Sequence, residues 1–400
     1  MIYASILGYG TVGAGVFKVL TMNAEAIARR AGEEIRVKYV LDLREFPGDP
    51  VMDVLTHDYQ DILDDPEVSI VVETMGGLRP AYQFTKNALL AGKSVCTSNK
   101  ELVAEHGVEL RRIAAEKKVN YLFEASCGGG IPIIHVLDDA LTADEIDSVT
   151  GIVNGTTNYI LTQMGESGAA FETALREAQA KGFAELHPEA DIEGHDAQRK
   201  LAILSTMAYH KHISYQNIYT EGISAIEADD IAYARAMGLK IKLLAASGRN
   251  EDGIWAMVAP MLVGSDNMLY HVDGVLNAVC VHGNALGEGL FYGSGAGRMP
   301  TASAVAGDVV TAARNLGRTI LSDWTDEETE LLPVDDVAHA FFVRFAGTKA
   351  EAAELFGDVP TVVLPDMPGE IGIMTDVMTE AAFRVIASRT KKIVKCIRRA

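Results

Sequence analysis

The chain has 400 residues, 48% of them hydrophobic and 22% charged, which is enough for about two or three globular domains with sizeable cores. Its formal net charge of -20 argues against nucleic acid or an anionic membrane as a partner. The four cysteines form no Cys-x-x-Cys pair, so we expect reduced thiols and a cytoplasmic protein. No run approaches the ~18 apolar residues of a membrane span, and residues 2–7 predict a strand rather than a signal peptide.

Strand-like and helix-like segments alternate over the first part of the chain. We expect strands at residues 3–7, 35–41, 69–73, 94–97 and 120–124, and helices at residues 14–29, 80–91 and 103–117. Alternation of this kind predicts a doubly wound parallel sheet of the Rossmann type.

A glycine pattern lies between the first strand and the first helix. Gly8, Gly10 and Gly13 follow the Gly-x-Gly-x-x-Gly spacing of a dinucleotide-binding turn, in which a pyrophosphate rests on the helix N-terminus. The alternative is a glycine-rich turn without a ligand. Asp42, at the end of the second strand, is placed to bind the ribose of NAD. Arg44 is close enough to accommodate the extra phosphate of NADP, so the choice of cofactor stays open.

Two loops follow other strands of this domain. Ser98 and Lys100 come after the strand at residues 94–97, where ligands bind in open α/β sheets, although Lys100 could equally be an exposed surface lysine. Glu124 begins a glycine loop that contains Cys127. Cys127 could be a nucleophile activated at a helix N-terminus, the loop oxygens could hold a monovalent cation, or the turn could pack around an inert thiol.

The pattern changes after residue 148. We expect a strand at residues 149–153, a polar turn at 154–158, helices at 171–181, at 195–209 and on both sides of Gly238, and strands of a second sheet at 255–262 and 277–281. Gly182 is the expected cap residue of its helix. A glycine-rich segment at residues 293–297 leads into a helix at residues 302–316, and the polar residues 322–332 indicate a linker.

A lysine lies among carboxylates in and before the helix at residues 195–209. Asp196 and Lys200 are four residues apart and therefore share one helix face, and Glu185 and Asp191 lie in the preceding loop. A lysine held among carboxylates can transfer a proton, whereas the simpler interpretation is an exposed ion pair. The histidines of this region form no metal-binding motif, and we expect surface or loop positions for His187, His195, His210 and His212.

Taken together, these motifs resemble homoserine dehydrogenase over about residues 1–325. The resemblance is carried by the segments Gly8-Tyr-Gly-Thr-Val-Gly13, Thr97-Ser-Asn-Lys-Glu-Leu-Val103, Glu124-Ala-Ser-Cys-Gly-Gly-Gly-Ile131, Gly151-Ile-Val-Asn-Gly-Thr-Thr-Asn-Tyr-Ile160, Gly182 to Lys200, and Gly295-Ala-Gly-Arg-Met-Pro-Thr-Ala302. It implies an NAD(P)-dependent interconversion of L-homoserine and L-aspartate 4-semialdehyde, in the biosynthesis of threonine, methionine and isoleucine.

The resemblance also implies roles for individual residues. Lys200 would be the general acid/base, acting through a water relay because Asp196 beside it favours the charged lysine. The substrate ammonium and hydroxyl would be bound by Glu185, Asp191 and Asp196. Cofactor contacts are implied for Gly8, Gly10, Thr11, Val12, Gly13, Asp42, Thr74, Ser98, Lys100, Gly182 and Gly297. A sodium-type ion would be bound by Glu124 and the carbonyls of Cys127, Gly129 and Ile131, which displaces the nucleophile interpretation of Cys127.

The tail, residues 339–400, resembles an ACT-type regulatory domain in its order of strand, helix, strand, strand, helix, strand. Ala346-Gly-Thr-Lys-Ala350 stands where that family commonly has Asp-Lys-Pro-Gly, and Leu41 stands where an arginine often precedes the position of Asp42. The tail therefore implies either an amino-acid effector or a role in assembly. A homodimer or homotetramer is expected.

The expected architecture has three parts. An α/β Rossmann-type nucleotide domain spans residues 1–130 and is completed by about residues 300–325, an α+β catalytic and dimerisation domain spans 131–300, and a small βαββαβ domain spans 338–400. Two other functions stay open on the residues alone: a Cys127-dependent aldehyde dehydrogenase that acts through a thiohemiacetal, and a non-catalytic amino-acid sensor.

Overall fold

The computed structural model describes residues 1–320 and 325–400, and these divide into two compact units. The first unit comprises Met1–Asp144, Ala202–Ser214 and Gly293–Thr329, and the second comprises Glu145–Leu201, Tyr215–Tyr292 and Glu330–Ala400. Part of the predicted linker at residues 322–332 lies outside the described residues. Its described part contains a short strand, β14 (Thr325–Glu328), which pairs with β8 (Lys211–His212).

The first unit is built on a six-stranded sheet in the order β3-β2-β1-β4-β5-β6. The strands are β1 (Ile2–Leu7), β2 (Ile35–Leu41), β3 (Leu55–Thr56), β4 (Val68–Glu73), β5 (Ser94–Thr97) and β6 (Tyr121–Leu122). All neighbours pair in parallel, which confirms the predicted Rossmann-type sheet. The chain order reverses beside β1, and ligands of open α/β sheets bind at such a point.

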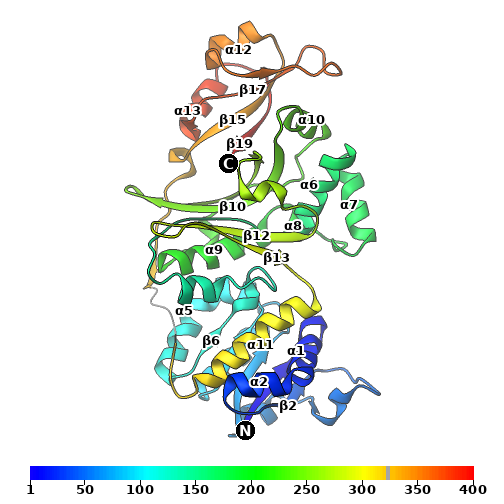
Figure 1. The fold of residues 1–400 in the computed structure, drawn as a ribbon, viewed down its shortest axis with the longest axis vertical. Helices are drawn as coiled ribbons and strands as arrows, with labels where there is room; N and C mark the ends of the chain where they lie inside the picture. Colours follow the sequence, from blue (N-terminus) through cyan, green and yellow to red (C-terminus); the bar gives the residue numbers. More distant parts are fainter. Residues whose placement is uncertain (321–324) are drawn as a thin grey trace. The chain divides into compact units, whose positions relative to one another are not determined.

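The helices of this unit are α1 (Thr11–Met22), α2 (Ala24–Ala31), α3 (Tyr59–Leu63), α4 (Ala81–Leu90), α5 (Lys100–Lys117) and α11 (Arg298–Arg314). The prediction of one continuous helix at residues 14–29 was wrong. The structure has two helices there, because Asn23 leaves helical geometry and separates α1 from α2. Helix α11 lies beside α1 (Figure 1). The two approach closely because Gly15 has no side chain: a Cβ there would lie 2.7 Å from the carbonyl oxygen of Arg298.

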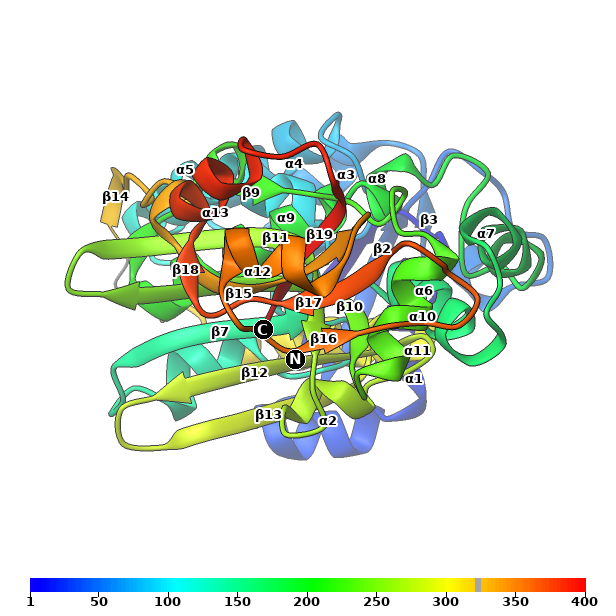
Figure 2. The same cartoon turned by 90° about the horizontal axis from the view of Figure 1, so that it is seen from above.

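The second unit contains a mixed sheet in the order β13-β12-β7-β10-β11-β19-β15-β17-β16, with β9 paired to β11 and β18 paired to β15. Its first strands are β7 (Ile146–Ile152), β9 (Tyr219–Thr220), β10 (Lys240–Asn250), β11 (Gly253–Val263), β12 (Leu276–Gly283) and β13 (Gly287–Ser294). Figure 2 shows β7, β12 and β13 running alongside one another. The helix expected after Gly238 was wrong: residues 240–250 pair with β11 along their whole length, and cross-strand pairing decided their structure.

The helices of the second unit are α6 (Gly155–Ser167), α7 (Phe171–Ala180), α8 (Glu189–Ile192), α10 (Ala228–Ala236), α12 (Lys349–Phe356) and α13 (Glu380–Ala387), together with the start of α9 (His195–Tyr209). Among the residues that the structure describes, no helix combines the length and apolarity that crossing a bilayer requires.

The C-terminal segment continues the sheet of the second unit. Its strands are β15 (Ala338–Phe345), β16 (Thr361–Val362), β17 (Ile371–Met374), β18 (Met378–Thr379) and β19 (Ile393–Arg399), and its helices α12 and α13 follow the predicted order, with β18 as an addition. The last strand, β19, pairs in parallel with β11 at Met261 and Leu262. The segment is therefore joined to the preceding strands by backbone hydrogen bonds rather than only by a linker.

Two buried arginines stabilise the contact between the C-terminal segment and the preceding elements of the second unit. The Arg344 guanidinium, 4% exposed, bonds to Asp230 at 2.8 Å and to Glu370 at 2.6 Å. The Arg398 guanidinium, 9% exposed, bonds to Glu380 and, at 2.8 Å, to Glu221. Buried charges of this kind are tolerated only with close partners, so each arginine fixes the residues that surround it.

Candidate functional site

The glycine turn of the first unit has the geometry of a nucleotide-binding turn. Gly8 adopts a φ of 92°, which favours glycine, and a Cβ on Gly13 would collide with the carbonyl oxygen of Gly8. A Cβ on Gly10 would meet no described atom within 4 Å, so this side of the turn is open. Thr11 and Val12 form the first turn of α1, where backbone N–H groups can bind a phosphate.

Asp42 follows β2 and lies against the glycine turn. Its carboxylate accepts a hydrogen bond from the Tyr9 N–H at 2.8 Å and from the Arg44 guanidinium at 2.9 Å. The Arg44 hydrogen bonds hold the pKa of the Asp42 carboxyl well below its usual range. The Arg44 side chain is 62% exposed and that of Asp42 is 9% exposed, so the pair joins a nearly buried carboxylate to a cation at the surface.

The turns after β4 and β5 are held by side chains that the sequence analysis did not single out. Glu73 is fully buried and accepts hydrogen bonds from the Thr97 hydroxyl at 2.6 Å and the Met75 N–H at 2.8 Å. Burial raises the pKa of Glu73. The Asn99 side chain caps α5 by accepting from the Leu102 N–H at 3.1 Å. Polar residues at or just beyond the ends of buried strands were the signal that could have indicated both.

These turns also place three of the predicted cofactor residues. The Thr74 hydroxyl donates to the carbonyl oxygens of Leu7 and Gly8, at 3.0 Å each, and so supports the glycine turn from beside it. Ser98 follows β5, and its N–H bonds to the Glu73 carbonyl at 3.4 Å. Lys100 is the first residue of α5, which begins earlier than predicted because Asn99 supplies the cap.

The glycine loop after β6 is organised by a buried carboxylate. Glu124 is 3% exposed, and its carboxylate accepts hydrogen bonds from the backbone N–H groups of Ile133, Ile134 and His135 at 2.7–2.9 Å. The pKa of Glu124 is raised, first by burial and then by Asp308. Asp308 in turn bonds to His135 at 2.8 Å, which raises the pKa of that imidazole to about 9.

Cys127 lies in the same loop and is fully buried. A substrate carbonyl cannot reach a thiol without surface exposure, so the geometry disfavours a thiohemiacetal mechanism. Gly129 has a φ of 57°, and a Cβ there would collide with Gly295, so the loop packs closely on the segment that leads into α11. Gly297, with a φ of 118°, caps that helix, and Ile131 is buried in the loop.

In the second unit, the ends of β7 and α9 gather the predicted proton-transfer and substrate residues. The Lys200 ammonium bonds to the Asp196 carboxylate at 2.7 Å and to the Val153 carbonyl oxygen at 2.8 Å. The Lys200 side chain is 12% exposed and that of Asp196 is 6% exposed. The interpretation as a solvated surface pair is therefore wrong, because the pair is held away from water (its helix is marked α9 in Figure 1).

Asn154 joins this cluster, although the sequence analysis treated it only as part of a polar turn. Its side-chain amide donates to Asp191 at 2.7 Å and to Asp196 at 2.9 Å. Three of the four predicted residues, Asp191, Asp196 and Lys200, are thus brought together at the end of β7. An asparagine directly after a strand and before a helix was the signal that could have indicated it.

The loop between α7 and α8 carries the remaining predicted residues. Lys181 is the C-cap of α7, and Gly182, which we expected at that position, is the next residue, with a φ of 74°. The Thr156 hydroxyl donates to the Phe183 carbonyl at 2.6 Å, which ties the loop to the start of α6. Glu185 has an exposed side chain, in contrast to the buried Asp196.

The four histidines in and around α9 and β8 lie at or near the surface. His187, His195 and His210 are exposed and His212 is half-buried in β8. Within residues 1–320 and 325–400, no group of three or more histidine, cysteine, aspartate or glutamate side chains could hold a metal ion.

A parallel sheet with a dinucleotide-binding turn, and a water-poor lysine among carboxylates, define an NAD(P)-dependent oxidoreductase. Residues 8–124 match the NAD binding domain of homoserine dehydrogenase, and residues 132–310 match homoserine dehydrogenase itself. The chain belongs to the homoserine dehydrogenase family.

Similar proteins agree along most of their length. The chain is 45% identical to homoserine dehydrogenase of Pseudomonas aeruginosa over 310 residues, which is 77% of this chain and 71% of that one. It is 42% identical to that of Helicobacter pylori, covering 85% and 80% of the two chains. The crystal structure of a homoserine dehydrogenase from Thiobacillus denitrificans is similar with a TM-score of 0.91 and 38% identity, over 100% of this chain and 98% of that one. A hyperthermophilic archaeal homoserine dehydrogenase in complex with NADPH is similar with a TM-score of 0.66 and 28% identity, over 79% and 99%.

Substitutions of Gly10 and Gly13 by alanine are expected to have different effects. Gly10→Ala adds a methyl group to the open side of the turn, so we expect the same thermal unfolding midpoint but a Kd for NAD(P) raised about tenfold or more, because the methyl blocks a pyrophosphate. Gly13→Ala forces an overlap inside the protein and should lower the free energy of unfolding by about 1–3 kcal/mol. Calorimetry and a cofactor titration measure both. Unchanged cofactor affinity of Gly10→Ala would exclude this turn as the pyrophosphate site.

Proposed function

We propose that the chain interconverts L-homoserine and L-aspartate 4-semialdehyde, with hydride exchanged with NAD or NADP. The observation that carries this proposal is the cluster of Lys200 and Asp191 around the buried Asp196 at the end of β7. A lysine in a water-poor site can exchange a proton with an alcohol or carbonyl oxygen. Carboxylates beside it suit a substrate that carries an ammonium group.

The proposed division of labour follows the chain. Residues 1–130, completed by about residues 300–325, bind the nucleotide, and residues 131–300 form the catalytic and dimerisation domain. Residues 338–400 form an ACT-like domain for regulation or assembly. The Rossmann-type order of β1 to β6 supports the assignment of nucleotide binding to residues 1–130. The pairing of β19 with β11 supports a structural role for residues 338–400.

In the proposed mechanism, a nicotinamide cofactor with its pyrophosphate at the glycine turn would supply the hydride chemistry. Asp191, Asp196 and Glu185 orient the substrate through its ammonium and hydroxyl groups. When homoserine is oxidised, the hydroxyl proton leaves oxygen as hydride leaves the adjacent carbon, and Lys200 in its neutral form receives that proton through a water molecule. In the reverse direction the Lys200 ammonium returns the proton by the same route. The relay is preferred because the Lys200 nitrogen is already held by Asp196 at 2.7 Å and by the Val153 carbonyl oxygen at 2.8 Å.

Replacement of Lys200 tests this assignment. We expect Lys200→Ala to lower kcat for homoserine oxidation by about 10²–10⁴-fold, because the proton acceptor is lost. Nicotinamide absorbance, followed with NAD and NADP in parallel, measures the rate. The matched control is Lys181→Ala, which removes a half-exposed lysine from another helical pair, with Glu177, and should leave kcat unchanged. No reduction of either cofactor by the folded unmodified protein would exclude homoserine as the substrate.

We propose that Asp42 and Arg44 together set the choice between NAD and NADP. Asp42 is placed to accept from the ribose hydroxyls, and its charge opposes a 2′-phosphate. Arg44 is exposed and can turn toward a phosphate if Asp42 releases it.

Asp42→Ala should therefore shift cofactor selectivity toward NADP. Loss of a charge-assisted hydrogen bond to the NAD ribose, with release of Arg44, should change the ratio of kcat/KM for the two cofactors by about ten- to hundredfold. Initial rates with each cofactor measure the ratio. Glu45→Ala, at a neighbouring exposed carboxylate that contacts His57, is the control and should leave the ratio unchanged. An unaltered ratio in Asp42→Ala would place the discriminating group elsewhere.

We propose that the loop at residues 124–131 binds a sodium-type ion through Glu124 and the carbonyls of Cys127, Gly129 and Ile131. The oxygen-rich chemistry of these ligands supports this proposal, because hard cations prefer oxygen. Three of the roughly four lone-pair sites of the Glu124 carboxylate are engaged by backbone N–H groups. The carbonyls would therefore supply most of the ligands.

Sodium should stabilise the protein beyond the effect of ionic strength. At a sodium concentration about ten times Kd, binding to the folded state adds about 1.4 kcal/mol, which calorimetry detects as a higher unfolding midpoint in sodium chloride than in choline chloride. Glu124→Gln should remove this difference, whereas Asp139→Asn, at an exposed carboxylate, should keep it. Equal midpoints of the unmodified protein in both salts would exclude the site.

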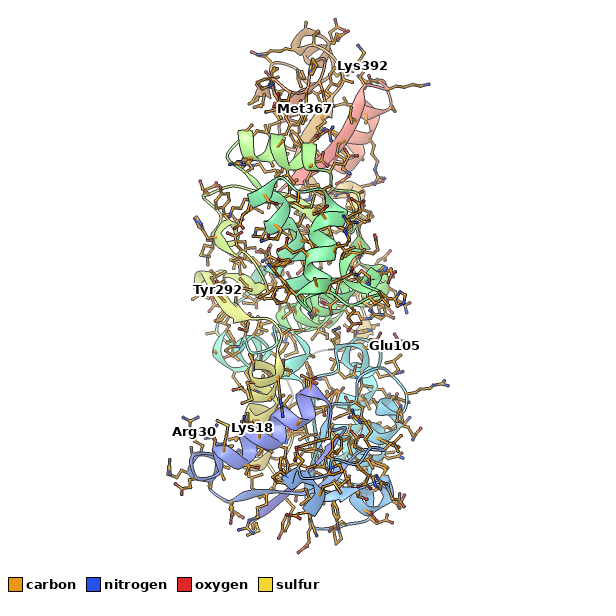
Figure 3. All side chains as sticks on the ribbon, turned by 90° about the vertical axis from the view of Figure 1, so that its right-hand side faces the viewer. Lys18, Arg30, Glu105, Tyr292, Met367 and Lys392 are labelled. Atoms are coloured by element: carbon orange, nitrogen blue, oxygen red, sulfur yellow. The ribbon has the colours of Figure 1, made fainter. Side chains whose placement is uncertain are left out.

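We further propose assembly as a homodimer or homotetramer and an amino-acid effector for the C-terminal segment. Assembly is supported by β13, an edge strand of the second sheet that exposes Leu290 and Tyr292 (Tyr292 is labelled in Figure 3). An exposed edge strand with apolar side chains favours pairing with another chain. The effector is supported only by the resemblance of the segment to ACT domains.

A further inference from the structure

Asn154 makes more hydrogen bonds than a helix cap requires. The side chain is 6% exposed, and its oxygen accepts from the Thr157 N–H at 2.9 Å, which caps α6. Its NH₂ group donates one hydrogen bond to Asp191 and one to Asp196. Because the oxygen is committed to a backbone N–H, the NH₂ group must face the carboxylates, and the orientation of the amide is fixed.

The two aspartates come from different elements. Asp191 belongs to the short helix α8 and Asp196 to the first turn of α9, with a turn at Gly194 between them. Two carboxylates this close repel each other, and such a pair normally takes up a proton unless donors lie between them. The Asn154 amide supplies those donors without adding charge, and Lys200 bonds to the same Asp196 oxygen.

A pair of carboxylates bridged by one amide suits one particular ligand group. A primary ammonium has three donors and binds two carboxylates through charge-assisted hydrogen bonds. Asp191 and Asp196 bring two carboxylates together beside one amine, that of Lys200, and this arrangement of acceptor oxygens suits a second amine.

We infer that Asn154 is a positioning residue that holds Asp191 and Asp196 as a receptor for the substrate ammonium. The inference rests on the proposed function, because it assumes the substrate-binding role of the two aspartates. Asn154 sets their separation and orientation, and it acts on the substrate only through them. Specificity for an amino acid over the corresponding hydroxy acid depends on this amide.

The experiment compares Asn154→Ser with the unmodified protein. Serine keeps the helix cap but cannot bridge two carboxylates. The KM for L-homoserine should rise about ten- to hundredfold, with a much smaller change in kcat and no change in the KM for NAD(P). Selectivity for L-homoserine over 2,4-dihydroxybutyrate, in which a hydroxyl replaces the amine, should fall by a similar factor. Asn267→Ser is the matched control: Asn267 caps a turn in the same unit, with its side chain 2.9 Å from the Leu269 N–H.

Asn154→Asp is a second variant that keeps both size and cap. The new carboxylate at position 154 would be surrounded by groups from three helices: Asp191 of α8, Asp196 and Lys200 of α9, and the Thr157 N–H of α6. Three carboxylates then share one site, so the acidic limb of the pH profile of kcat/KM for homoserine should move to higher pH. A purely structural cap would leave that limb in place.

Each outcome decides a separate point. If the unmodified protein oxidises homoserine but Asn154→Ser keeps its KM and its selectivity, the positioning role is overturned. If Asn154→Ser fails to fold, the pH profile of Asn154→Asp decides in its place. If the unmodified protein does not oxidise homoserine, the proposed function fails, and the inference that rests on it falls with it.

Discussion

Charges that are removed from water must be paired, and this constraint organises the candidate site. Asp196 and Lys200 are 6% and 12% exposed, and an isolated charge at such a position would cost several kcal/mol. The cost is offset by the Val153 carbonyl and the Asn154 amide, which stand at the end of β7. The strand therefore fixes where α9 presents its charged residues, and the chemistry of the site depends on that strand end.

The same constraint recurs in other parts of each unit. In the first, Glu73 and Glu124 are buried beside the turns that follow β4 and β6, and each holds its turn by accepting backbone N–H groups. In the second, Arg344 and Arg398 fasten the C-terminal strands to carboxylates of the preceding elements. Arg398 of the last strand bonds to Glu221, and two residues further on the Ile223 N–H bonds to the Ile192 carbonyl oxygen. Ile192 directly follows Asp191 in the chain, so a short series of contacts joins β19 to the substrate cluster.

Local patterns predicted those parts of the fold that depend on local physics. The glycine spacing after β1 and the four-residue spacing of Asp196 and Lys200 follow from backbone geometry, and both appear in the structure as expected. The prediction of a helix after Gly238 failed because it depended on distant partners. Residues 240–250 have enough apolar side chains for either a helix or a strand, and pairing with both β7 and β11 decided for a strand.

The sequence by itself determined the class of fold, the nucleotide-binding turn, the helix that carries Lys200 and the resemblance to homoserine dehydrogenase, because each depends on residue types at short, fixed spacings. Only the tertiary structure decided that the lysine pair is largely shielded from water and that Asn154 joins Asp191 to Asp196. It also decided that the Glu124 carboxylate holds a backbone turn and that the C-terminal segment continues the second sheet. Burial and partnership arise when segments far apart in the chain pack together, and no local spacing encodes them.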